Sequence, residues 1–255
     1  MSRSERVLAA LLILPALALA AVLHWRGRNV SAEQRGYAVA ERFGCYNCHG
    51  PGGRHGMTNP GHELGDVPPW SGGLITMYAE NEAEVREWIL DGMPRRLRED
   101  PQQVKLREKA AIQMPAFRGV LRGRDLEDLV AYVKAVSDLE KPQDAKADEG
   151  RRAAASYGCF NCHGPQGRGT PSNPGSLKGY IPSWDGPDFP ELARDDAEVR
   201  EWILDGNVRR LVANPAARFF LERQRVKMPA YRGHIKDDEL EQIVAYIRWL
   251  RTPRG

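Results

Sequence analysis

Apolar residues recur along this chain at the three- and four-residue spacing of amphipathic helices. One helix is predicted over residues 82–91 and another at the end of the first half of the chain. Their apolar faces are Val85, Trp88 and Ile89 for the former, and Leu126, Leu129, Val133 and Val136 for the latter. An opening helix is expected from Ser31, which lies three residues before Gln34 as in a capping box, to near Phe43. Residues 50–80 are rich in Gly and Pro and predict a loop. Because no stretch alternates as a β-strand does, the pattern predicts an all-α fold.

The helical pattern occurs twice, with a constant step of 114 residues from Cys45 to Cys159. The segment AEVREWILDG at 83–92 recurs letter for letter at 197–206, and QMPAFRG in the first copy answers to KMPAYRG in the second. A shared offset over such a length indicates duplication of a whole domain.

The duplication predicts two domains and a short polar linker. We expect a signal segment, a first domain, the linker and a second domain at residues 1–30, 31–139, 140–148 and 149–255. The same step pairs Gly36 with Gly150 and Tyr132 with Tyr246. A helical glycine costs about 1 kcal/mol relative to alanine, so we expect each glycine to be the point where the first and last helices cross.

The N-terminus is predicted to be a signal anchor or a signal peptide. An unbroken apolar run over 7–23 follows a basic start. The stretch from Ala18 to Ala20 offers a cleavage site, but the run continues toward Trp25, a residue that suits a membrane interface. We favour a retained membrane anchor over 7–25, with a cleaved signal as the alternative. Either reading places the bulk of the chain outside the cytoplasm.

Charge adds little beyond the N-terminus. The formal net charge is +3, and residues 1–28 hold four arginines and one glutamate, so the rest of the chain is formally neutral. Nucleic-acid binding favours a concentrated basic face, which this composition does not offer. No nucleic-acid partner is therefore expected.

All four cysteines lie in two matching motifs, GCYNCHG at 44–50 and GCFNCHG at 158–164. A redox dithiol needs only Cys-x-x-Cys and leaves the histidine unexplained. A zinc site could take two thiolates from each copy. Covalent haem c uses the whole motif, because both thiols bond to the haem and the histidine ligates its iron. We therefore favour two haem c groups. Their covalent attachment points would be Cys45, Cys48, Cys159 and Cys162.

The order helix, Cys-x-x-Cys-His, loop, middle helix, Met-Pro and final helix resembles the class I cytochrome c fold, here as a tandem dihaem protein. The resemblance covers residues 32–139 and 147–251. It implies iron bound axially by one His and one Met in each domain, namely His49 with Met114 and His163 with Met228. A thioether is a soft ligand that favours reduced iron, and it suits an electron carrier.

The resemblance also suggests residues around each haem. A histidine ligand usually has its other ring nitrogen held by a carbonyl, and the family's proline carbonyl is expected at Pro60 and Pro174. Trp70 and Trp184 are expected to wall the haem or to reach a propionate, with ordinary core packing as the alternative. The arginine fork matches a carboxylate, so Arg95 and Arg209 are candidate propionate partners, or else solvated surface residues.

These features favour an electron-transfer protein over an enzyme. It would pass single electrons between redox partners or within a membrane respiratory or dehydrogenase complex, on the periplasmic side of a bacterial inner membrane or, if cleaved, free in the periplasm. The alternative is a dihaem peroxidase-like enzyme, which needs one displaceable axial ligand. Two Met-Pro motifs and the symmetry of the repeats argue against that alternative.

Overall fold

A computed structural model of the chain describes residues 13–17, 20–22, 29–137 and 139–252. Most of the apolar run at 7–23, including Ala18 and Leu19 of the cleavage site, lies outside these residues, so the anchor stays a prediction. Within the described ranges, none of the helices has the length and apolarity to cross a bilayer. These residues form helices and turns without a β-strand, which confirms the all-α prediction.

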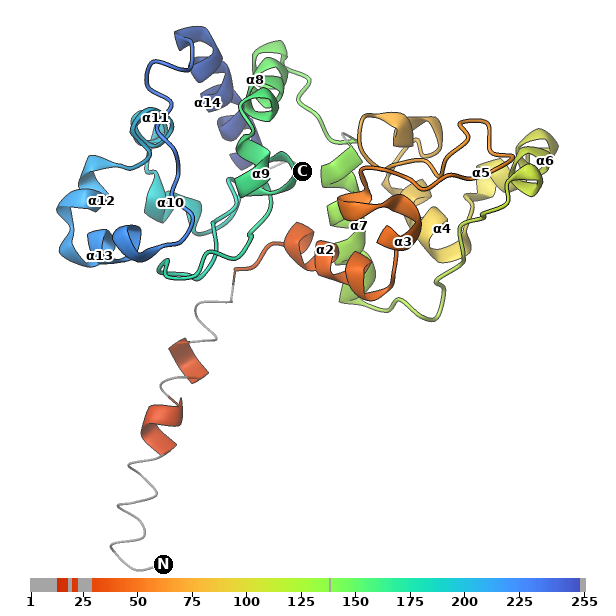
Figure 1. Cartoon of the computed structure of the whole chain (residues 1–255), viewed down its shortest axis with the longest axis horizontal. Coiled ribbons are helices and arrows are strands. Elements are labelled where there is room, and N and C mark those ends of the chain that lie inside the picture. The colour runs from red at the N-terminus through yellow and green to blue at the C-terminus, as the bar shows by residue number, and fades with distance from the viewer. Residues whose placement is uncertain (1–12, 18–19, 23–28, 138, 253–255) are drawn as a thin grey trace, which may run out of the picture.

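The helices form two sets, which we call the first half (residues 29–137) and the second half (residues 144–252) (Figure 1). The first half contains α2 (Ala32–Arg42), α3 (Tyr46–His49), η1 (Pro51–Gly53), η2 (Leu74–Met77), α4 (Glu82–Asp91), α5 (Arg95–Arg98), α6 (Pro101–Lys109) and α7 (Arg124–Ser137). The second half contains α8 (Ala145–Ser156), α9 (Cys159–His163), η3 (Pro165–Gly167), α10 (Phe189–Leu192), α11 (Asp196–Asp205), α12 (Arg209–Ala213), α13 (Pro215–Arg223) and α14 (Asp237–Arg251).

Local sequence explains where the main helices begin and end. The Ser31 side chain accepts a hydrogen bond from the backbone N–H of Gln34, which is half of the predicted capping box. The other half is absent, because the Ser31 N–H donates to Thr170 and not to Gln34. The middle helices α4 and α11 are each opened by an Asn or Asp cap and closed by Gly92 or Gly206. Both glycines adopt a left-handed conformation, with φ of 72° and 70°.

The first and last helices of each half cross in close contact at the glycine that the sequence singles out. A Cβ atom on Gly36 would lie 1.9 Å from the Asp128 carbonyl oxygen and 2.6 Å from Tyr132 Cβ. A Cβ atom on Gly150 would lie 1.9 Å from the Gln242 carbonyl oxygen. Only a residue without a side chain fits, which confirms the predicted crossing.

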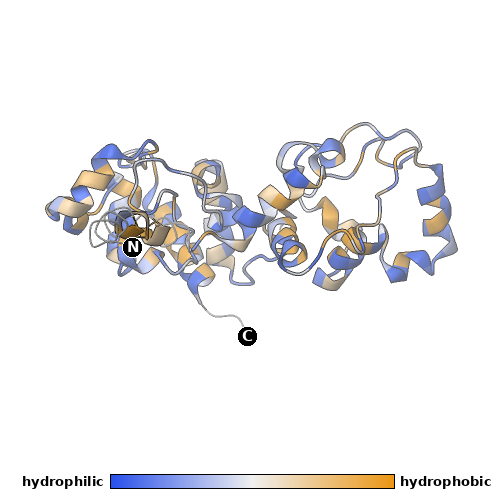
Figure 2. Cartoon of the chain, turned by 90° about the horizontal axis from the view of Figure 1, so that it is seen from below, coloured by the Kyte–Doolittle hydropathy of each residue, from blue (hydrophilic) through white to orange (hydrophobic). Residues whose placement is uncertain are grey.

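Each half has its own apolar core, and hydrophobic and hydrophilic residues alternate along its helices (Figure 2). The core of the first half gathers α2, α4 and α7 around Trp70, and that of the second gathers α8, α11 and α14 around Trp184. The buried members include Val39, Val85, Ile89, Leu129 and Val133 in the first half, and Ala154, Val199, Ile203, Ile243 and Ile247 in the second.

The expected linker at 140–148 is wrong at its C-terminal end. Helix α8 begins at Ala145, and the Asp144 side chain caps it by accepting from the Ala147 N–H. Because α8 packs closely against α14, its buried residues are small: Ala147, Gly150, Ala153 and Ala154. Small residues give a weak hydrophobic periodicity, which is why the pattern of apolar residues misses this helix start.

Polar contacts join the two halves where the start of α2 meets the loop after η3. The Asn29 amide donates to Asp188 at 2.8 Å, and the Ser31 N–H donates to the Thr170 hydroxyl at 2.9 Å. Arg168 of the second half also forms an ion pair with Glu140, in the segment between the halves, at 2.9 Å. These contacts give the halves a shared interface.

Glu33 lies buried in this interface among other charged groups. Its side chain is 12% exposed, with Arg168 4.0 Å away and the Asp185 carboxylate nearby. Burial, with repulsion from Asp185, outweighs the attraction of Arg168 and raises the pKa of Glu33 to about 7.

The raised pKa of Glu33 predicts a pH-dependent stability. The folded chain binds the proton of the Glu33 carboxyl more tightly than the unfolded chain does. The contribution of this proton to the free energy of unfolding is therefore complete below the ordinary carboxyl pKa and is lost as pH rises through about 7. At about pH 8 we expect Glu33→Gln to raise the free energy of unfolding by up to about 3 kcal/mol, measured as a higher urea midpoint. At about pH 5 the substitution should raise the free energy of unfolding only slightly. An equal effect of the substitution at both pH values would contradict this assignment.

The helix crossing predicts that Gly150→Ala destabilises the second half, although alanine is the better helix former. The gain of up to about 1 kcal/mol in helix propensity is outweighed by an overpacking cost of about 1–3 kcal/mol or more, because a backbone oxygen must move. Urea unfolding followed by circular dichroism measures the change. Lys146→Ala on the exposed face of α8 is the matched control and should leave the midpoint unchanged, whereas a neutral Gly150→Ala would refute close crossing.

Candidate functional site

Each half encloses a cavity whose walls are mainly apolar. We call them the first cavity, of about 220 Å³, and the second cavity, of about 360 Å³. Each brings together the four site residues that the sequence predicts for its own half. These are Cys45, Cys48, His49 and Met114 in the first cavity, and Cys159, Cys162, His163 and Met228 in the second.

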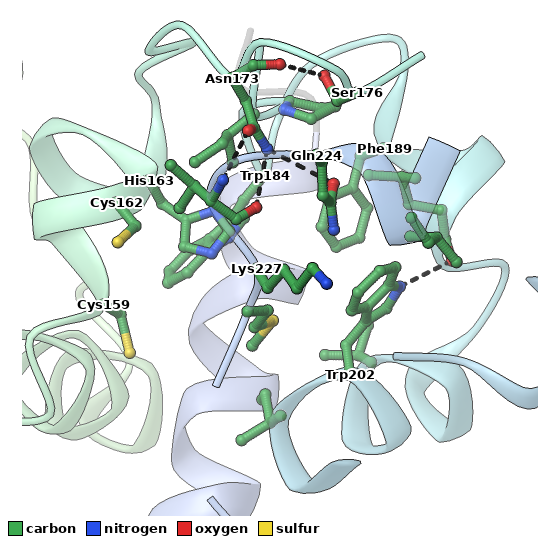
Figure 3. A pocket seen from close by; sticks show the side chains of 18 of the residues that line it. Cys159, Cys162, His163, Asn173, Ser176, Trp184, Phe189, Trp202, Gln224 and Lys227 are labelled. Atoms are coloured by element: carbon green, nitrogen blue, oxygen red, sulfur yellow. Dashed lines mark hydrogen bonds between the residues drawn. The ribbon is translucent and has the colours of Figure 1, made fainter. Parts of the chain in front are cut away.

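One turn of helix places the two thiols and the histidine on the same wall. In α9, Cys159, Cys162 and His163 stand at positions i, i+3 and i+4, which share a helix face. Figure 3 shows the three side chains arising together at one side of the second cavity. A glycine with positive φ precedes each motif, and Gly50 or Gly164 ends it. A Cβ atom on Gly50 would lie 1.9 Å from the His55 carbonyl oxygen, so the turn after the motif requires glycine.

The histidine of the first motif has a fixed orientation. His49 Nδ1 lies 3.0 Å from the Pro68 carbonyl oxygen, which can only accept, so Nδ1 carries the proton and the neutral ring keeps its free electron pair on Nε2. Burial lowers the pKa of His49, although the Pro68 carbonyl opposes that shift. The neutral imidazole is the form that binds a metal ion.

The histidine of the second motif, His163, is also half-buried. Burial lowers the pKa of His163 to about 4. Its Nδ1 has no hydrogen-bond partner in the part of the chain that the structure describes, although Pro182, the counterpart of Pro68, also lines the second cavity. Both rings lie against a tryptophan. Ring centroids are 4.8 Å apart for His49 and Trp70, and 5.0 Å apart for His163 and Trp184.

The expected carbonyl partner at Pro60 and Pro174 is wrong. The Pro60 carbonyl accepts from the Ala111 N–H at 2.8 Å, and the Pro174 carbonyl accepts from the Arg225 N–H at 2.9 Å. These prolines therefore hold the segment that leads to the methionine, and Pro68 serves His49 instead. The signal available was the Pro68-Pro69-Trp70 stretch, which ends at the tryptophan that contacts the histidine.

The asparagine before each of these prolines has a role that sequence reasoning missed. Asn59 accepts from the Ile112 N–H at 2.8 Å and donates to its carbonyl at 2.9 Å. Asn173 makes the same pair of bonds with Val226, at 2.9 Å each. Each asparagine thus clamps the backbone two residues before the methionine. The Asn-Pro-Gly triplet, present at the same position in both copies, was the signal for it.

The methionine segments are also tied to the middle helices. The Phe117 N–H donates to the Ile89 carbonyl, and the Tyr231 N–H donates to the Ile203 carbonyl, at 3.1 and 3.0 Å. Gly92 lies so close to the methionine segment that a Cβ atom there would be 2.4 Å from the Met114 carbonyl oxygen. The position of each methionine is therefore set by backbone contacts on both sides of it.

Trp70 and Trp184 form part of the cavity walls, as expected for residues beside a bound group. Both are buried, at 7% and 5% exposure. Gly53 and Gly167 make room for them, because a Cβ atom there would lie 2.1 and 2.3 Å from the indole rings. Contact with a propionate stays a prediction.

The expectation that Arg95 and Arg209 face the bound group is wrong. Their side chains are 75% and 92% exposed and pair with Glu99 and Glu201 at the surface. Each arginine opens a short helix whose third residue, Leu97 or Leu211, lines the cavity instead. A single helical turn cannot point both positions inward, which is why the arginines face solvent.

The arginine that follows each of these two exposed arginines forms an ion pair with the middle helix. Arg96 and Arg210 pair with Glu84 and Glu198 at 2.7 Å. The Arg210 guanidinium lowers the pKa of Glu198 to about 2, and Arg96 lowers the pKa of Glu84. These pairs fix the short helices α5 and α12 to α4 and α11.

The cysteines do not suit either alternative chemistry. No disulfide joins them, and burial raises the pKa of Cys45 and of Cys159 to about 11, which disfavours the thiolate that a redox dithiol needs. A shared zinc site would need two thiolates from each motif, but the two motifs line different cavities. Among the described residues, no three His, Cys, Asp or Glu side chains gather as a metal site would require.

The donor set of each cavity fits a covalently bound haem. Two adjacent thiols can form thioether bonds, a neutral imidazole beside them can bind iron, and a methionine on a separate segment can supply the opposite ligand. The mainly apolar walls suit a flat apolar ring.

Comparison with known proteins supports this fit for the second half. Residues 147–251 match the family described as Cytochrome c. Neither the curated proteins nor the solved structures that were searched gave a match. The second half is therefore a cytochrome c domain, which implies covalently bound haem c with iron and supports a role in electron transfer.

The asparagine clamp predicts a local effect of Asn173→Ala. Loss of two buried hydrogen bonds, at about 1–3 kcal/mol for the groups left unpaired, should free the methionine segment while the helix crossing stays intact. Hydrogen exchange should show faster exchange of the Val226 amide and unchanged exchange in α14. Asn173→Asp keeps the acceptor for the Val226 N–H and should show a smaller effect. If the Val226 amide exchanges as slowly in Asn173→Ala as in the unmodified chain, the asparagine clamp is disproved.

Proposed function

We propose that the chain is a dihaem c-type cytochrome that transfers single electrons through one His/Met-ligated haem in each half. One observation carries the proposal: each half gathers its own two thiols, histidine and methionine around its own apolar cavity. The match of residues 147–251 supports the second site, and the same set of elements around the first cavity extends the proposal to the first half.

The chain's residues have distinct parts in this proposal. The thiols of Cys45, Cys48, Cys159 and Cys162 would anchor the haems. His49 and His163 would bind iron through Nε2, and Met114 and Met228 would bind it from the opposite side. Bound haem c supplies iron that changes by one electron between the ferric and ferrous states. The buried rings of Trp70 and Trp184 would exclude water beside the histidines.

The way the methionines are held favours an electron carrier over a peroxidase-like enzyme. A peroxidase needs an axial position that opens to the substrate, whereas a carrier keeps both ligands. Both methionine segments are fixed by an asparagine clamp and by backbone bonds to the middle helix. This arrangement supports two closed irons, and the contacts between the halves would hold the two sites in one molecule side by side.

Partners and location follow from the sequence and are part of the proposal. Haem c is attached outside the bacterial cytoplasm, and the apolar run at 7–23 is suited to export or anchoring. We place the protein on the periplasmic side of the inner membrane, where it would exchange electrons with redox proteins or a respiratory complex.

Haem stoichiometry is the first test. We expect two haems per chain by the pyridine haemochrome assay after expression with a haem c maturation system. The double variants Cys45→Ala/Cys48→Ala and Cys159→Ala/Cys162→Ala should each retain one. Two haems that survive in either double variant would contradict covalent attachment at that motif.

Ligation is tested by carbon monoxide. Both reduced haems of the unmodified chain should be low-spin and should not bind the gas, because both axial positions are filled. Met114→Ala and Met228→Ala should each open one haem, and Met77→Ala, at a site 61% exposed, is the matched control. Carbon monoxide binding by the unmodified chain would favour the peroxidase-like alternative.

A further inference from the structure

Arg107 is the arginine that lines the first cavity. It belongs to α6 and donates from Nη2 to the carbonyl oxygen of Met114 at 3.3 Å. Gly92 allows this approach, because a Cβ atom there would lie 3.3 Å from Nη2. The guanidinium is thus held against the peptide of the residue proposed as the iron ligand.

Among the residues that the structure describes, no carboxylate forms an ion pair with Arg107, and its buried Nε has no hydrogen-bond partner. Two nearby arginines, by contrast, each have a carboxylate partner: Arg96 pairs with Glu84, and Arg118 with Asp91, both at 2.7 Å. The Arg107 side chain is half-buried and its Nε atom is shielded from solvent, so solvent and counter-charge screen its electric field only in part.

The second half lacks this charge. The position equivalent to Arg107 is Leu221, which lines the second cavity. Two lysines also line that cavity, but Lys178 is paired with Asp188 at 2.9 Å, and Lys227 is exposed and therefore screened (Figure 3). The same scaffold therefore places a half-buried cation without an ion-pair partner beside one proposed iron site, and an apolar residue at the equivalent position of the other.

We infer that Arg107 raises the reduction potential of the first haem and so makes the two proposed irons inequivalent. This inference rests on the proposed function. Ferric haem carries one more positive charge than ferrous haem, so a fixed cation beside the axial methionine disfavours the ferric state. The charge acts through space on the haem, and the hydrogen bond to the Met114 carbonyl keeps it in place.

Exchanging the two equivalent residues tests the inference. Both potentials are measured by spectroelectrochemistry on the full haem-loaded chain. Arg107→Leu should lower the reduction potential of the first haem by about 59 mV, which is a tenfold change in the reduced-to-oxidised ratio for one electron. The potential of the second haem should stay unchanged. Leu221→Arg should raise the potential of the second haem. Arg107→Lys keeps the charge and should retain most of the original value.

Each outcome decides the inference. Shifts of opposite sign on different haems, with the lysine variant close to the unmodified chain, support it. Equal shifts in Arg107→Leu and Arg107→Lys would show that packing matters and charge does not, and would overturn it, as would unchanged potentials in Arg107→Leu. Haem content and the methionine-ligated spectrum are recorded for every variant. A chain that carries fewer than two haems before substitution refutes the proposed function instead.

Discussion

The close crossing of the first and last helices is the constraint on which each half depends. Gly36 and Gly150 let the helix backbones approach to a distance that no side chain tolerates. The crossing brings the last helix near the loop after the Cys-x-x-Cys-His motif, where its tyrosine hydroxyl donates to a loop carbonyl. The bonds run from Tyr132 to Gly52 at 3.1 Å and from Tyr246 to Gln166 at 2.9 Å. The helix crossing thus fixes the turn that follows each histidine.

The opposite wall of each cavity is held by separate means. An asparagine side chain holds the backbone ahead of the methionine, and the end of the middle helix accepts hydrogen bonds from the backbone after it. Because the histidine and methionine walls are fixed by separate sets of bonds, the chain itself sets the spacing between them. A fixed spacing suits a carrier, since little must move when an electron arrives.

Residues whose role depends on their own motif or local pattern could be predicted from the sequence. The Cys-x-x-Cys-His turns and the capped middle helices need only short-range spacing. The repeat locates each of them twice, and it also singles out the crossing glycines. Roles that depend on where a loop goes could not be predicted. The family resemblance places the Pro60 carbonyl beside the histidine, yet the loop directs it to the Ala111 N–H. Arg95 was predicted to bind a propionate because its fork matches a carboxylate, whereas the single turn of α5 directs its side chain to solvent.

The two halves share their backbone constraints but differ in the charges around them. At the turn where the first half has Gly52, the second half has Gln166, a buried residue with φ of 53°. This left-handed conformation costs about 1–2 kcal/mol for a residue with a side chain. The Gln166 carbonyl nevertheless accepts from the tyrosine of the last helix, as the Gly52 carbonyl does. Exposed Leu64 of the first half becomes Lys178, buried against Asp188, in the second. A scaffold that relies on backbone hydrogen bonds leaves the side chains around the cavity free to vary. Duplication could therefore keep one architecture and give its two sites different electrostatic surroundings.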